Sequence, residues 1–237
     1  EESPGASSHI AIGLTSFGMD VSFHTAIGDD PEGSSILSSL KENQIATGHI
    51  IQVEGRTTLT KIRFFGSRES LLDRSQILLQ ADKGPNEELD PSISESLTKT
   101  ALTNVPDSCA LVISDYDKGV VTNHGAQQLI QSAKKSGIPV IVDPKLTGLE
   151  KSRGATVVIF EKRGMTLLAR RMGLENDAAA TRLLEDYSWD GILVLGGIHG
   201  MHLHQKDTES IFMPCMAPTA EQQIGMHDAA AASLAAA

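Results

Sequence analysis

The hydrophobic positions along the chain predict an alternation of buried strands and helices. Short, strand-like apolar runs recur, and segments with helical periodicity separate them. The expected strands are Val21–Ile27, Ala110–Ser114, Pro139–Val142, Thr156–Phe160 and Ile192–Leu195. The expected helices are Ile10–Gly18, Ser34–Gln44, Ser92–Thr103, Asn123–Ser136 and Ala178–Asp186. Continuous apolar strands that alternate with helices indicate an α/β fold with a parallel sheet covered on both faces.

One stretch does not follow this rhythm. Polar and apolar residues alternate over Thr57–Phe65, and a second strand-like piece, Gln76–Ala81, follows a polar segment. Such alternation predicts strands with one apolar face, so we expect an exposed antiparallel hairpin, or β-lid, over about 56–82. A lid of this kind either closes over a ligand or pairs with another subunit. The alanine-rich Ala229–Ala237 predicts the start of a helix.

The excess of acidic over basic residues bears on whether the chain binds nucleic acid. The chain of 237 residues fits a single α/β domain, 1–237, and carries 20 Lys and Arg against 30 Asp and Glu, a formal net charge of −10. This balance argues against nucleic-acid binding by the domain as a whole. Contact with nucleic acid stays open only at one basic cluster, which solvated helix faces also explain. The cluster is Lys162, Arg163, Arg170 and Arg171.

Cysteine usage and hydropathy bear on the compartment and on metals. Cys109 and Cys215 have no metal-like spacing, and a reduced intracellular compartment is the default for such a chain. No apolar run reaches the length of a transmembrane helix, so we expect no membrane contact and no secretion. Bacterial cytoplasm and an organelle matrix, such as the mitochondrial one, are equally compatible. His199, His202 and His204 lack a partner ligand at matching spacing, so no metal site is expected.

Polar residues follow three predicted elements where a ligand would bind. Open parallel sheets bind ligands at the carboxyl ends of their strands. The segments 114–119 and 143–145 follow two predicted strands and contain Lys118 and Lys145, both candidate anion ligands. The segment 225–228 precedes the alanine-rich helix and ends in Asp228. This aspartate is either a catalytic carboxylate or a helix cap.

Several segments, in order, resemble the kinase domain of the bacterial heptose-7-phosphate kinases, a branch of the ribokinase (PfkB) family. They are Ala11–Gly18, Ala26–Asp30 with Glu32-Gly33, Arg56–Lys61, Gln76–Leu79 with Asp82, Ser114–Val121, Val140–Lys145 and Arg153–Thr156. The resemblance spans nearly the whole chain, and the combination of Ser-Asp-Tyr-x-Lys-Gly-Val with Val-Asp-Pro-Lys is specific for this branch. It implies a ribokinase-like three-layer α/β/α sandwich with a small β-lid, shortened at both ends relative to the family.

The resemblance also implies a site. Such enzymes are ATP- and Mg²⁺-dependent, and they hold the transferring phosphate on backbone N–H groups ahead of a catalytic aspartate. The base would be Asp228, and the anion hole would be Gly225, Met226 and His227. The substrate contacts would be Gly5, Ala6, His9, Lys118, Asp143 and Lys145. The nucleotide contacts would be Glu161, Gly164 and Gly200.

The chain departs from the family pattern at these contact elements. Met226 and His227 stand where the family has small residues, and their side chains would occupy space that the phosphates need. Glu161 replaces an asparagine, and Gly164 replaces a glutamate. Since four ligand elements are altered while the fold-determining elements persist, we expect a pseudokinase that serves as a scaffold or interaction subunit and needs no cofactor.

The expected partners are other protein subunits, including a second copy through the lid, and a sugar phosphate is a further possible ligand. Two other functions stay open. One is an ATP-dependent, heptose-phosphate-like sugar kinase that uses ATP and Mg²⁺ to transfer the γ-phosphate to a sugar hydroxyl. The other is a sensor that binds a sugar phosphate or nucleotide without transfer.

Overall fold

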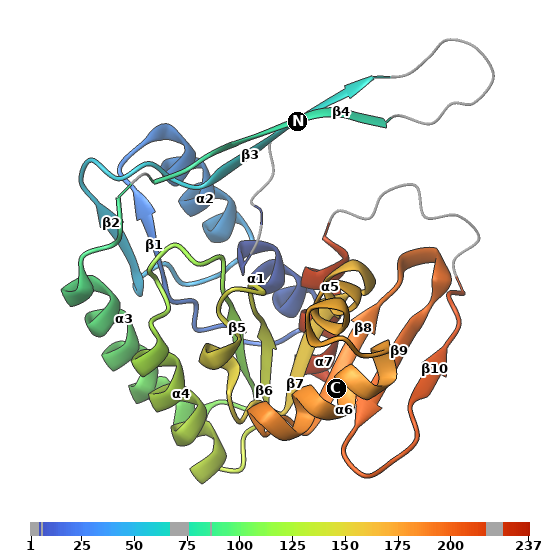
Figure 1. Ribbon diagram of the computed structural model, residues 1–237. Helices are drawn as coiled ribbons and strands as arrows, with labels where there is room; N and C mark the ends of the chain where they lie inside the picture. Colours follow the sequence, from blue (N-terminus) through green and yellow to red (C-terminus); the bar gives the residue numbers. More distant parts are fainter. Residues whose placement is uncertain (1–4, 6, 67–75, 86, 217–224) are drawn as a thin grey trace.

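The computed structural model describes residues 5, 7–66, 76–85, 87–216 and 225–237. Its centre is a six-stranded sheet in the order β10-β9-β8-β7-β6-β5 (Figure 1). The four parallel strands are β5 (Leu111–Ser114), β6 (Val140–Asp143), β7 (Val157–Glu161) and β8 (Gly191–Leu195). The two antiparallel strands are β9 (Met201–Gln205) and β10 (Ile211–Met213). The predicted, mainly parallel sheet is therefore confirmed.

Helices cover both faces of this sheet, which gives the three predicted layers (Figure 1). On one face lie α4 (Asn123–Lys135), α5 (Lys162–Met172) and α6 (Asn176–Tyr187). On the other face lie α1 (Ser7–Ser16) and α7 (Met226–Ala236). α3 (Pro91–Asn104) packs beside α4, and α2 (Pro31–Glu42) lies against α1 and the strand β1 (Thr25–Gly28).

The alternation of side chains along the strands explains the layers. In β6, Val140 and Val142 belong to the apolar cluster under α4, α5 and α6, whereas Ile141 belongs to the cluster under α1 and α7. Successive side chains of a strand point to opposite faces of the sheet, so a strand buried on both faces must be apolar throughout. Trp189 anchors the larger cluster, is fully buried and donates its indole N–H to the Ser152 carbonyl at 2.8 Å.

All five predicted strands and all five predicted helices occur, with shifts of a few residues at their ends. The largest shift is at Val21–Ile27, where β1 begins only at Thr25 and Ser22 makes a single isolated bridge to Ala46. The alanine-rich segment is confirmed as the helix α7. The pattern did not predict α5, β9 and β10, nor β2 (Ile50–Val53), which pairs with β1 in a separate parallel sheet.

Asp30 joins the start of the lid to the body of the domain. It caps α2 by accepting a hydrogen bond from the Gly33 N–H at 2.8 Å, and it also accepts from the Thr58 N–H at 2.8 Å and hydroxyl at 2.6 Å. Burial alone would raise the pKa of Asp30, but the hydrogen bonds from Thr58 and Gly33 lower it overall. Gly28 is required here, because a Cβ would collide with the Arg56 carbonyl oxygen.

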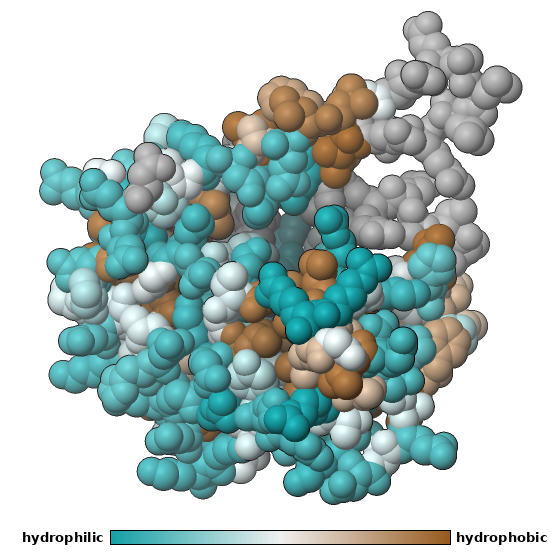
Figure 2. Space-filling model, in the orientation of Figure 1, coloured by the Kyte–Doolittle hydropathy of each residue, from teal (hydrophilic) through white to brown (hydrophobic). Residues whose placement is uncertain are grey.

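The predicted hairpin is confirmed as the antiparallel pair β3 (Thr60–Gly66) and β4 (Gln76–Lys83). Phe64 lies directly opposite Leu79, and Ile62 lies opposite Ala81 on the same face, because alternate residues of paired strands share a face. Ile62, Phe64 and Leu79 are 42%, 51% and 58% exposed. Figure 2 shows apolar side chains gathered along the lid at the top of the molecule. We call Ile62, Phe64, Leu79 and Ala81 the apolar lid face.

Candidate active site

Most of the predicted site residues line one cavity at the carboxyl ends of β5, β6 and β7, and the lid lies above this end of the sheet (Figure 1). This cavity of about 2610 Å³ continues between β1 and β5. The predicted site residues that line it are Gly5, His9, Lys118, Asp143, Lys145, Glu161, Gly164, Gly225, Met226, His227 and Asp228. Gly200 is not among the lining residues and packs instead against the carbonyl of Met213 on β10. Ala6 lies outside the described residues.

His227, the second residue of α7, stands between the ends of two strands. Its Nδ1 lies 3.2 Å from Oδ1 of Asp143 at the end of β6, and its Nε2 lies 3.7 Å from Oε1 of Glu161 at the end of β7. Burial alone would lower the pKa of His227, but the hydrogen bond to Asp143 and the charges of Asp143, Glu161 and Asp228 raise it. The imidazole is therefore held among carboxylates that favour its protonated form.

Asp228 is buried in the first turn of α7, with its residue only 8% exposed. Its Oδ2 lies 3.5 Å from Nδ1 of His9 on α1, and its Oδ1 is buried without a hydrogen-bond partner in the described structure. Burial is the main cause of its raised pKa, the negative charge of Asp143 adds to it, and His9 opposes it. The N-cap of α7 is Gly225, with φ of 83° and no capping side chain, so the helix-cap interpretation of Asp228 is wrong.

A second, smaller cavity of about 330 Å³ adjoins the base of the lid. It is lined by Lys61, Lys118, Lys145, Tyr116, Asp82 and three apolar or small residues. The Lys145 ammonium lies 5.0 Å from the Tyr116 ring centroid, within the range of a cation–π contact. Burial, and then the charges of Asp228 and Asp143, raise the pKa of the Tyr116 hydroxyl, which therefore stays neutral. Lys61 is paired with Asp82 at 3.0 Å.

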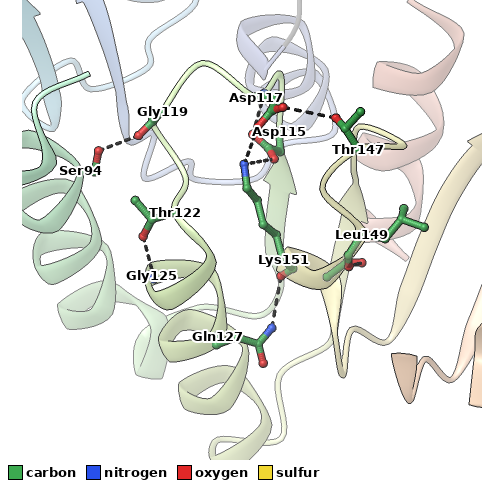
Figure 3. A network of polar contacts seen from close by, with 11 residues as sticks. Ser94, Asp115, Asp117, Gly119, Thr122, Gly125, Gln127, Thr147, Leu149 and Lys151 are labelled. Carbon is green, nitrogen blue, oxygen red and sulfur yellow. Dashed lines mark hydrogen bonds and ion pairs between the residues drawn. The ribbon is translucent and has the colours of Figure 1, made fainter. Parts of the chain in front are cut away.

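The loop that holds Tyr116 and Lys118 is fixed by an ion cluster of buried Lys151 and Asp115 with half-exposed Asp117, which the sequence did not predict. Figure 3 shows the Lys151 side chain pointing between Asp115 and Asp117, with Nζ–oxygen distances of 2.7 and 3.0 Å. Thr147 donates its hydroxyl to Asp117 at 3.3 Å, and Asp117 has a φ of 55°, which is uncommon for a residue other than glycine. Lys151 lies in a single 3-10 turn (Leu149–Ser152), and its position carried no motif.

The arrangement fits an Mg-nucleotide poorly. Asp143, Glu161 and Asp228 place three carboxylates around the amino end of α7, and the His227 ring stands between two of them. A phosphate entering here would be repelled by the carboxylates and would meet the imidazole. Across the described ranges, no group of three or more His, Cys, Asp or Glu residues is arranged to hold a metal ion. None of the helices described combines the length and apolar composition that crossing a membrane requires.

Comparisons with known proteins place these features in context. The profile of the pfkB family of carbohydrate kinases matches residues 4–237. The Bifunctional protein HldE of Escherichia fergusonii is 30% identical over 239 residues, which cover all of this chain and 47% of that protein. HldE of Shigella dysenteriae serotype 1 gives the same identity and coverage. The chain thus spans about half the length of the curated relatives it matches.

Solved structures share the fold at lower identity. A fructokinase with bound ATP from Xylella fastidiosa has a TM-score of 0.74 and 18% identity, over 98% of this chain and 72% of that one. The tetrameric inhibited form of phosphofructokinase-2 from Escherichia coli has a TM-score of 0.71 and 18% identity, over 99% of this chain and 75% of that one. These likenesses support the ribokinase-like fold.

Proposed function

The chain belongs to the pfkB family of carbohydrate kinases, and we propose that it keeps this fold as a catalytically inactive interaction subunit of a larger assembly. A fold and its chemistry are separable, because catalysis depends on a few groups in the site whereas the fold depends on the core. The relatives are named as bifunctional proteins about twice as long as this chain, which is consistent with a domain that works beside others.

Two departures from the family pattern at the amino end of α7 carry this proposal: Glu161 adds a carboxylate to Asp143 and Asp228, and the His227 ring stands between Asp143 and Glu161. Phosphoryl transfer depends on positive charge and on N–H donors around the transferring group. Here Asp143 and Glu161 flank His227, and Asp228 lies buried beside them. A single imidazole cannot balance three acids and a phosphate together, so the site disfavours the anion that a kinase must hold.

The apolar lid face supports the interaction role. Ile62, Phe64 and Leu79 are large, exposed and adjacent on one face of the β3–β4 hairpin. Contiguous exposed apolar surface commonly marks a protein–protein contact. The proposed partner is a second copy of the chain, whose lid would cover the same residues across a two-fold axis.

A second candidate is an ATP-dependent carbohydrate kinase, and Asp228 favours it. Asp228 is among the residues that line the cavity, and its Oδ1 is buried and has no hydrogen-bond partner in the described structure. A carboxylate held in this way can accept the proton of a substrate hydroxyl. ATP with Mg²⁺ would then be the phosphoryl donor, and a sugar or sugar phosphate would be the acceptor.

A turnover assay separates the two candidates. The purified chain is incubated with Mg-ATP and a panel of sugars and sugar phosphates that includes heptose-7-phosphate, and ADP release is compared with that of the Asp228→Ala variant. We expect no difference between them. Acceptor-dependent ADP release that disappears in Asp228→Ala would establish the kinase and reject the inactive subunit.

A further inference from the structure

The His227 side chain lines the cavity at the amino end of α7, beside the carboxyl ends of β6 and β7. We infer that His227 is a built-in plug that excludes phosphate-bearing ligands from the amino end of α7, and that its removal opens this place to them. This inference rests on the proposed function, because it names the residue that keeps the site closed. Its geometric basis is the ring position between Asp143 at 3.2 Å and Glu161 at 3.7 Å.

The backbone beneath the plug is suited to an anion. The first N–H groups of a helix have no partner within that helix, and with the helix dipole they attract negative charge. α7 is 11 residues long and begins after Gly225, whose φ of 83° sets the sharp entry of the chain. The obstruction at this point is therefore a side chain placed over a backbone that could still bind an anion.

An independent feature shows that the site is built to contact a ligand. The side chain of Asp228 is nine-tenths buried, with 10% exposure, yet its Oδ1 has no hydrogen-bond partner in the described structure. Unsatisfied buried carboxylate oxygens are costly, so proteins retain few of them without a partner. A hydroxyl group of a bound ligand would satisfy this oxygen once the cavity admits it.

His227 alone, and not its neighbour Met226, blocks the amino end of α7. The Met226 side chain packs against the apolar cluster formed by α1, α7 and the sheet, so it is anchored away from the two strand ends. The His227 side chain is 21% exposed, and its Nδ1 is hydrogen-bonded to Asp143 at 3.2 Å. Its Nε2 lies 3.7 Å from the Glu161 carboxylate and has no hydrogen-bond partner in the described structure.

The test replaces the plug and measures nucleotide binding. His227→Gly and His227→Ala are made in a chain that also carries Glu161→Asn, so that removal of the imidazole does not leave this carboxylate beside the phosphates, and both are compared with Glu161→Asn alone by calorimetric titration with Mg-ATP and Mg-ADP. We expect a gain in affinity of about tenfold or more in both variants. His124→Ala in the same background is the matched control, because His124 is also the second residue of its helix, α4, but is exposed on the surface. The control should bind no better than Glu161→Asn alone.

Unchanged affinity in folded His227 variants would overturn the plug. If both variants fail to fold, a measurement on the wild-type chain takes their place. Diethyl pyrocarbonate should modify His227 more slowly than His124, and equal rates would contradict a wedged ring. The two hypotheses can be rejected independently. Turnover by the wild-type chain would reject the proposal that it is catalytically inactive. Unchanged nucleotide affinity in the His227 variants would reject only the proposal that His227 blocks the site.

Discussion

The Lys151 ammonium lies 2.7 Å from Oδ2 of Asp115, although the two side chains are only 11% and 3% exposed. The same nitrogen contacts Asp117 at 3.0 Å, and burial alone would lower the pKa of Lys151, but the hydrogen bonds it donates to these two carboxylates raise it. Burying charges is costly unless each is paired, so the three side chains depend on one another. They hold the loop that carries Tyr116 and Lys118 into the cavity.

Replacing Lys151 with methionine should lower the free energy of unfolding by about 3–5 kcal/mol, because Asp115 would be left buried without a countercharge. Urea denaturation measures this loss. Arg182→Met is the control, since its pair with Asp186 is exposed and should change stability by about 1 kcal/mol or less. If both variants lose equally little free energy of unfolding, the contacts of Lys151 with Asp115 and Asp117 do not stabilise this loop.

Stability should fall as the pH decreases from about 6.5 towards 4, in part because of His24. Burial, together with the nearby His49, lowers the pKa of His24 to about 4, from an unfolded value of 6.5. The unfolded chain therefore takes up the proton first, so the contribution of neutral His24 is complete above pH 6.5 and lost by pH 4. His24→Gln should flatten the pH dependence of urea unfolding in this window. An unaltered slope would contradict the assignment.

Thr58→Val should destabilise the base of the lid. Thr58 donates its hydroxyl to Asp30 at 2.6 Å and accepts the Gly28 N–H at 2.9 Å, and it is 5% exposed. Removal of the hydroxyl leaves buried groups unsatisfied, which costs about 1–3 kcal/mol in unfolding experiments. Thr100→Val, which loses an exposed bond to the Ser96 carbonyl, is the control and should change stability far less. Similar losses at both positions would argue against this role.

Phe64→Asp should prevent self-association. A charge on the apolar lid face would have to be buried unpaired in a two-fold interface, so sedimentation should show a concentration-dependent dimer for wild type and a monomer for the variant. Phe17→Asp is the matched control, because Phe17 is 58% exposed at the end of α1, outside the lid. A wild-type chain that stays monomeric, or a variant that still dimerises, would reject the lid interface.

Much of the fold could be predicted from the sequence because its core strands are apolar on both faces. The run Val140–Val142 signals such a strand without any knowledge of its neighbours. The helix α5 was not predicted, because the basic residues at its two ends were interpreted as a cluster of surface charge. Its buried side is formed by Met165, Leu168 and Ala169. β9 and β10 were not predicted because both are short and largely exposed: β9 alternates apolar and polar residues over only five positions, and β10 has only three residues.

The site was only partly accessible from the sequence. The topology rule brought the segments 114–119, 143–145 and 225–228 to one edge of the sheet, and the family pattern added Glu161. The contacts themselves join distant positions: His227 and Asp143 are 84 residues apart, and Lys151 and Asp115 are 36 apart. No local pattern marks such pairs. The sequence could show that His227 was unusual, but not that its ring is hydrogen-bonded to Asp143 and lies beside the Glu161 carboxylate.

We propose that the phosphate site of this carbohydrate-kinase fold is closed, and a thermal-shift titration of the wild-type chain with Mg-ATP measures whether it is. A ligand at a hundred times its Kd stabilises the native state by about 2.7 kcal/mol. For a chain of this size that corresponds to a rise in Tm of roughly 5–11 °C. The account predicts no rise at millimolar nucleotide. A saturable rise in Tm of that size would show that the chain binds the nucleotide, which would contradict a closed site and favour an active kinase.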